Sequence, residues 1–169
     1  KNLNLFYGDF HALKDVNVKI VPKGITALIG PSGCGKSTLL RVFNRMNDLV
    51  IGVKITGEVC VFGKTIFEKD ILELRRSVGM VFQRPNPFPL SVFENMVFGL
   101  RIQGIRKRSL LEEKTEKSLT SVGLWQQLKD KLNVNALSLS GEEQQRLCIA
   151  RVLTVKPDIL LMDEPCSAL

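Results

Sequence analysis

The chain has 169 residues, 44% of them hydrophobic, and a net charge of +7, which suits one domain with a sizeable core. Its four cysteines form no C-x-x-C pair, which argues against a disulfide framework or a zinc site and favours a reducing, cytosolic setting. No run of eighteen apolar residues is present, so we expect no membrane-spanning segment. The positive net charge fits a nucleic acid, an anionic membrane surface or a polyanionic nucleotide as partner.

Two segments near the N-terminus alternate apolar and polar residues, the pattern of half-buried strands. They cover residues 3–6 and 16–20, and we predict that they form an antiparallel β edge. Tyr7 follows the first segment. Its ring could stack on a nucleotide base, and the alternative is that it only packs at a strand end.

Residues 30–38 fill every fixed position of the phosphate-binding loop G-x-x-x-x-G-K-[ST]. The apolar run 25–29 predicts a buried strand before this loop, and residues 37–47 predict a helix after it. The glycines let backbone N–H groups turn toward phosphates at a helix N-terminus. The residues predicted to bind the nucleotide are Gly30, Pro31, Ser32, Gly33, Cys34, Gly35, Lys36, Ser37 and Thr38.

Two of these loop residues have specific predicted roles in a nucleotide triphosphatase. Lys36 would reach the β- and γ-phosphates as a catalytic residue, and Ser37 would hold Mg²⁺. The alternative is a chance glycine-rich turn before a helix, which the complete motif and its flanking elements disfavour.

The middle of the chain predicts a strand at 57–63, a helical turn at 71–76 and a buried strand at 78–82. Gln83 follows the last strand, and residues 84–89 include three prolines that exclude a helix. A polar amide at such a strand end points into the crevice where α/β sheets bind ligands. Gln83 is therefore predicted to touch the metal or its water, the alternative being a solvent-facing amide.

A helical pattern covers residues 91–135, which we predict to be a helical subdomain inserted into a core of residues 1–90 and 136–169. Ser91 with Glu94 and Ser109 with Glu112 match the capping box S-x-x-E. Ser140 with Glu143 forms a third such box, at the start of an amphipathic helix that runs to about residue 154.

Four apolar residues, 159–162, precede Asp163 and Glu164 and predict a buried strand that delivers two carboxylates to its tip. Asp163 would bind Mg²⁺ directly or through water, and Glu164 would polarise the water that attacks the γ-phosphorus. An ordinary solvated turn is the alternative, and the phosphate-binding loop disfavours it.

These motifs, in this order, resemble the nucleotide-binding subunits of ABC transporters over nearly all of residues 3–169. The resemblance implies an α/β P-loop NTPase core with an antiparallel β edge and an inserted helical subdomain, incomplete at the C-terminus. It implies ATP and Mg²⁺ as cofactors and assigns base stacking to Tyr7. It also implies that two such subunits close head to tail around two ATP molecules, Ser140 and Gly141 facing the γ-phosphate of the partner's ATP. The N-terminus of the helix after Ser140 is a suitable anion site.

The resemblance further implies two transmembrane permease subunits, an indirect role for a periplasmic or extracellular solute-binding protein, and a peripheral location on the cytoplasmic face of the bacterial inner membrane. Three segments, residues 43–49, 78–89 and 163–169, resemble the ATPase subunits of bacterial phosphate importers. The expected function is thus ATP hydrolysis coupled to uptake of inorganic phosphate, and no nucleic acid is expected.

The chain departs from the family where Glu142 and Glu143 replace the second glycine and the glutamine of the signature L-S-G-G-Q. A carboxylate near a bound phosphate is repelled, so we expect weakened ATP-dependent dimerisation. Three alternatives stay open: an ABC ATPase for another solute, a catalytically impaired nucleotide-binding fragment, and an ABC ATPase that acts on nucleic acid.

Overall fold

The computed structural model describes residues 1–165, which divide into an N-terminal unit, Lys1–Val78, and a C-terminal unit that begins at Gly79. The predicted core segment 136–169 ends in residues 166–169, which lie outside the described residues. The elements of the N-terminal unit are β1 (Leu3–Tyr7), β2 (Phe10–Val16), α1 (Lys36–Phe43), the 3-10 helix η1 (Met46–Leu49), β3 (Val53–Thr56), β4 (Cys60–Val61), β5 (Lys64–Thr65) and α2 (Ile71–Ser77).

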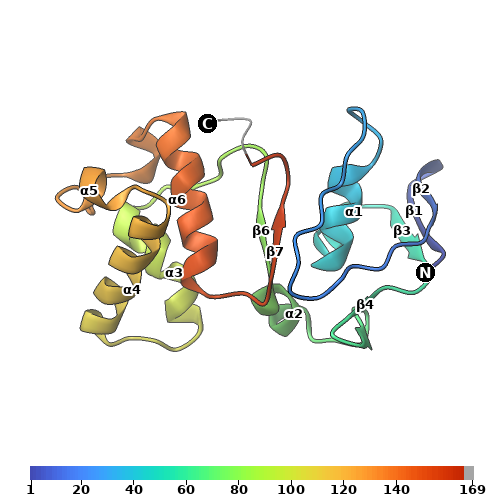
Figure 1. Cartoon of the computed structure of the whole chain (residues 1–169), viewed down its shortest axis with the longest axis horizontal. Helices are drawn as coiled ribbons and strands as arrows, with labels where there is room; N and C mark the ends of the chain where they lie inside the picture. Colours follow the sequence, from blue (N-terminus) through green and yellow to red (C-terminus); the bar gives the residue numbers. More distant parts are fainter. Residues whose placement is uncertain (166–169) are drawn as a thin grey trace. The chain divides into compact units, whose positions relative to one another are not determined.

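The N-terminal unit has an antiparallel three-stranded sheet of order β2-β1-β3, as the predicted β edge requires (Figure 1). The first predicted strand is confirmed as β1. The second prediction is wrong, because the partner of β1 is β2 and residues 17–20 form no strand. Asp15 turns into the left-handed region at φ 45°, and Asn17 donates a side-chain hydrogen bond to its carbonyl, which ends the ladder there.

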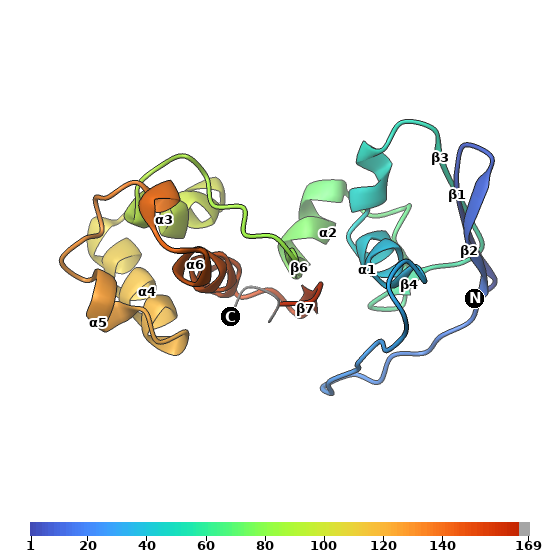
Figure 2. The same ribbon diagram turned by 90° about the horizontal axis from the view of Figure 1, so that it is seen from above.

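The apolar run 25–29 is not the buried strand that its composition predicts. No strand or helix lies between β2 and α1, and Figure 2 shows the segment that connects them as an extended loop. Ile25 and Ile29 are almost fully exposed. A central strand is buried only when neighbouring strands pair with it, and none of the described residues pairs with this run.

Shorter elements differ from prediction in their length. The strand predicted at 57–63 is reduced to a two-residue hairpin arm, β4, which pairs with β5. Phe62 and Gly63 connect the two arms with φ of 54° and 71°, the left-handed backbone of a tight hairpin turn. The helix predicted at 37–47 is confirmed as α1 but ends at Phe43, followed by η1. The helical turn predicted at 71–76 is confirmed as α2.

The C-terminal unit combines a two-stranded sheet, β6 with β7, and a group of helices. Figure 2 shows α6 nearly end-on with α3 and α4 beside it. Its elements, of which β6 starts at the last residue of the N-terminal unit, are β6 (Val78–Val81), α3 (Val92–Ile102), α4 (Arg108–Ser121), α5 (Trp125–Leu128), the 3-10 helix η2 (Ala136–Ser138), α6 (Gly141–Thr154) and β7 (Ile159–Met162).

The strands predicted before Gln83 and Asp163 are confirmed as β6 and β7. Two of the three predicted helix caps form. Ser91 accepts a hydrogen bond from the Glu94 backbone N–H at 3.1 Å, and Ser140 forms a full capping box with Glu143. The prediction for Ser109 is wrong: α4 begins at Arg108, with Lys107 at the N-cap position, two residues before Ser109. The Arg108 guanidinium pairs with the Glu112 carboxylate.

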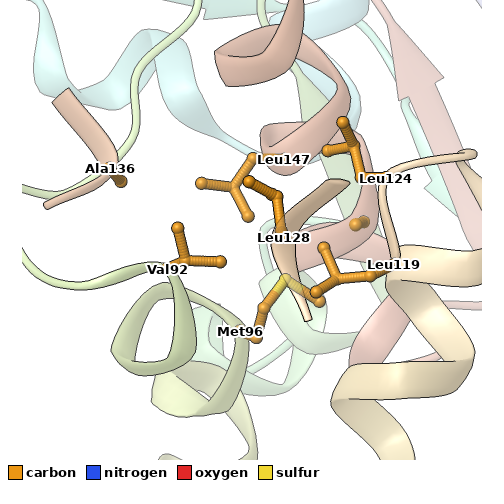
Figure 3. Packing of buried hydrophobic residues seen from close by; sticks show 8 residues of the cluster. Val92, Met96, Leu119, Leu124, Leu128, Ala136 and Leu147 are labelled. Atoms are coloured by element: carbon orange, nitrogen blue, oxygen red, sulfur yellow. The ribbon is translucent and has the colours of Figure 1, made fainter. Parts of the chain in front are cut away.

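The helices of the C-terminal unit share one apolar cluster, in which side chains from α3, α4, α5 and α6 point toward one another (Figure 3). All of its members are 0 or 1% exposed. They are Val92, Met96, Leu119, Leu124, Leu128, Ala136, Leu147 and Ala150. This packing fixes α6, and with it the position of Ser140 relative to α3 and α4. The division into a core and a subdomain at 91–135 stays a prediction.

Candidate nucleotide-binding site

The phosphate-binding loop lies at the N-terminus of α1, and two of its three glycines have a left-handed backbone. Gly33 and Gly35 have φ of 78° and 97°. Gly35 caps α1, and a Cβ there would lie 2.8 Å from the Leu13 side chain, so the helix start packs directly on β2. Residues 30–34 are exposed, which leaves the loop open to a ligand.

Lys36 folds back across this loop. Its ammonium donates hydrogen bonds to the backbone carbonyls of Gly30 at 2.8 Å and Pro31 at 2.9 Å, and it lies 3.9 Å from the Cys34 sulfur. The Lys36 ammonium, which a phosphate would attract, is thus held by two carbonyls of the exposed loop. A triphosphate would exchange these ammonium–carbonyl contacts for hydrogen bonds in which the acceptor is charged as well as the donor, which are stronger.

Tyr7 is connected to the loop helix through a buried asparagine. Its hydroxyl donates to Asn47 Oδ1 at 3.1 Å, and Asn47 Nδ2 donates to the Thr38 carbonyl at 2.9 Å. Asn47 is 1% exposed. Tyr7 is half-buried at the end of β1, and the two hydrogen bonds through Asn47 fix its ring relative to α1. Base stacking by Tyr7 stays a prediction. Sequence reasoning missed Asn47, and no pattern in the chain identifies it.

In the C-terminal unit, three of the predicted metal and catalytic residues, Gln83, Asp163 and Glu164, follow the paired strands β6 and β7, whereas Lys36 and Ser37 belong to the N-terminal unit. The side-chain amide of Gln83 donates to Glu164 Oε2 at 2.6 Å, and the Asp163 N–H donates to the Val81 carbonyl at 3.0 Å. Asp163 is 2% exposed, whereas Gln83 and Glu164 are exposed. Glu164 has φ of 45°, which turns the chain at the tip of β7. Gln83 is thus an exposed amide that also contacts Glu164, and its contact with a metal or its water stays a prediction.

The donors are of the type that Mg²⁺ prefers, namely a hydroxyl, a carboxylate and an amide carbonyl. Because its Nε2 donates to Glu164, Gln83 has only its carbonyl oxygen to offer a cation. No group of three or more His, Cys, Asp or Glu side chains that could hold a metal occurs within residues 1–165. The assignment of Ser37, Gln83 and Asp163 as Mg²⁺ ligands stays a prediction.

The N-terminus of α6 carries the two acidic departures from the signature. The Glu143 carboxylate accepts a hydrogen bond from the Ser140 N–H at 2.9 Å, and Ser140 Oγ accepts one from the Glu143 N–H at 3.3 Å. Glu142 instead pairs with Arg146 one turn later. Ser140, Gly141 and Glu142 are all exposed, so this helix start is accessible. The ion pair with Arg146 partly neutralises the Glu142 carboxylate, which reduces the repulsion expected between Glu142 and a bound phosphate.

The proline-rich loop after Gln83 is held by two side chains that sequence reasoning did not single out. The Arg151 guanidinium lies 4.3 Å from the centre of the Phe88 ring and donates to the Asn86 carbonyl at 3.1 Å. Asn95, fully buried, accepts from the Phe88 N–H at 2.8 Å. Burial lowers the pKa of Arg151 and raises the pKa of the neighbouring Cys148 thiol. The loop is extended and defined, as its prolines predict.

Known proteins with similar sequences and structures share these motifs' family. The family described as ABC transporter matches residues 13–167. The chain belongs to the ABC transporter family. Its mixed α/β fold agrees with those of solved members. One is cbiO1 of Clostridium perfringens, part of an ABC transporter complex, with a TM-score of 0.79 and 30% identity. That match covers all of this chain and 65% of cbiO1. A bacterial Atm1-family ABC exporter with ATP bound has a TM-score of 0.81 and 28% identity over 99% of this chain and 29% of its own.

Curated relatives cover the whole chain. It is 60% identical to the phosphate import ATP-binding protein PstB of Borreliella afzelii and 53% identical to the PstB protein of Bacteroides fragilis. The chain spans 66% and 68% of the length of these two relatives. The resemblance predicted from the sequence is thus confirmed. No helix of residues 1–165 is both long and apolar enough to cross a bilayer.

Proposed function

We propose that this chain is the ATP-binding part of an ABC importer that couples ATP binding and hydrolysis to the uptake of inorganic phosphate. The observation that carries the proposal is the identity of 53 to 60% to phosphate import ATP-binding proteins over the full chain. The complete phosphate-binding loop at the N-terminus of α1 supports the nucleotide chemistry.

The residues act in a simple order in this proposal. Lys36 leaves the Gly30 and Pro31 carbonyls and binds the β- and γ-phosphates, while the glycine backbone provides N–H donors. Glu164 accepts the proton of the attacking water, and Gln83 holds that carboxylate through Oε2. The residues proposed to hold Mg²⁺ are Ser37, Gln83 and Asp163, and the ion would neutralise charge on the phosphate oxygens.

The proposed partners follow from the family. A second ATP-binding subunit would pair head to tail, with Ser140 and Gly141 at the γ-phosphate of the partner's ATP, and Tyr7 would stack on the base. Two permease subunits and, indirectly, a solute-binding protein would complete the importer on the cytoplasmic face of the inner membrane. No nucleic-acid partner is proposed.

The test is complementation of a bacterial strain that lacks its own phosphate-import ATP-binding subunit. We expect the chain to restore uptake of radiolabelled phosphate, and K36A to abolish that uptake. Restored uptake of a different solute would overturn the cargo assignment, and ATP binding without any uptake would favour the impaired-fragment alternative.

A further inference from the structure

Gln145 of α6 contacts the backbone on both sides of the Gln83 and Glu164 pair. It is 0% exposed, and its Nε2 donates to the Phe82 carbonyl at 3.1 Å and to the Pro165 carbonyl at 3.3 Å. Phe82 directly precedes Gln83, and Pro165 directly follows Glu164. One buried amide therefore joins the two chain segments that deliver the pair.

The chemistry of these contacts fixes the amide in one orientation. Both partners are carbonyl oxygens, so only the NH₂ group of Gln145 can face them, and its two N–H donors match two acceptors. Gln145 Oε1 is buried and accepts no hydrogen bond from residues 1–165. An unsatisfied buried acceptor opposes stability, so the net contribution of this side chain to folding is expected to be small. The role of the buried Gln145 amide is therefore better explained by its contacts with the Phe82 and Pro165 carbonyls than by stability.

We propose that Gln145 is a positioning residue that fixes the distance between Gln83 and Glu164 and ties both to α6. The inference rests on the proposed ATPase function, in which Glu164 is the general base. Gln145 lies five residues after Ser140 on the same helix, so a shift of α6 when Ser140 meets a partner's nucleotide would reach the strand ends through this amide. Gln145 itself touches no reacting atom.

The test compares Q145M with two controls in the full chain. Methionine has a similar volume and no donor, so Q145M removes both hydrogen bonds without a buried charge. Q127M makes the same change at an exposed position of α5, and L128A lowers stability through the apolar cluster that packs on α6. The readouts are ATPase kinetics, thermal unfolding and the NMR signal of the Gln83 side-chain amide, which reports its contact with Glu164.

We expect Q145M to lower kcat roughly tenfold or more with KM for ATP within about twofold of wild type, because the phosphate-binding loop is unchanged. The Gln83 amide should shift and exchange faster with solvent, while the unfolding temperature stays near that of wild type. Q127M should match wild type, and L128A should lower the unfolding temperature without moving the Gln83 signal.

The inference is overturned if Q145M keeps both kcat and the Gln83 signal, or if L128A loses kcat in the same proportion as Q145M. Should Q145M fail to fold, Q145N keeps the polarity but shortens the reach by one methylene and should show the same loss of kcat. If the wild-type chain does not hydrolyse ATP, the proposed function fails, and the Gln83 amide signal still decides the positioning role.

Discussion

Gln83 Nε2 donates a hydrogen bond to Glu164 Oε2 at 2.6 Å, although the two residues are 81 positions apart in the chain. The contact links the second residue after β6 to the second residue after β7, and both side chains are exposed. A donor at this distance orients the carboxylate without neutralising it. The proposed general base is thus held in one orientation by Gln83.

The first prediction concerns Glu164. E164Q keeps the size of the side chain but removes the base, so ATP hydrolysis should fall by about 10² or more while ATP binding is retained. Single-turnover hydrolysis and equilibrium binding of a fluorescent ATP analogue measure the two effects. Hydrolysis at the wild-type rate in E164Q would show that Glu164 is not the base.

The second prediction concerns the acidic signature. We expect the double variant E142G/E143Q to dimerise more tightly with ATP than wild type, because two negative charges leave the helix start that we propose to face the γ-phosphate of the partner's ATP. E143Q alone should leave the capping box intact, since a glutamine oxygen also accepts from the Ser140 N–H. Analytical ultracentrifugation with ATP in an E164Q background measures the dimer. Equal dimer affinity of wild type and double variant would refute the expectation.

The third prediction concerns the cap of α6. S140A removes the acceptor for the Glu143 N–H and should lower the free energy of unfolding by about 1 kcal/mol. S91A at α3 is the matched control, because it removes the same type of contact to Glu94 outside the proposed nucleotide site. Both should lose similar stability in urea denaturation, and only S140A should also weaken ATP-dependent dimerisation. Equal effects on the dimer would remove Ser140 from the interface.

The fourth prediction concerns pH. Burial raises the pKa of the Cys148 thiol above its ordinary value of 9.0. The unfolded chain therefore releases this proton first as pH rises, so the stability that the neutral buried thiol provides is present below pH 9 and is lost as pH rises through the folded pKa. The free energy of unfolding should fall less steeply between pH 8 and about pH 10 in C148A than in wild type. Identical slopes would contradict the assignment.

Local patterns predicted what depends on adjacent residues. The phosphate-binding loop at the start of α1, the Ser140 capping box and the strands β1, β6 and β7 follow from residue type and spacing, and so do the positions of Gln83 and Glu164 after two of these strands. The two wrong strand predictions failed because of strand pairing. Residues 16–20 alternate apolar and polar side chains, but the strand that pairs with β1 is β2. The apolar run 25–29 has no strand beside it among the described residues. Gln145 and Asn47 were missed because a buried amide is identified by its partners, which the sequence does not show.

The central claim is that the loop of residues 30–38 binds a triphosphate through its backbone and Lys36, and affinity for MgATP tests it most directly. Isothermal titration should compare wild type, K36A and the exposed control K64A. Loss of charge-assisted hydrogen bonds should weaken binding by roughly 1.5–3 kcal/mol, a factor of about 10 to 150, in K36A and leave K64A at the wild-type affinity. Equal affinity of K36A and wild type would contradict the account.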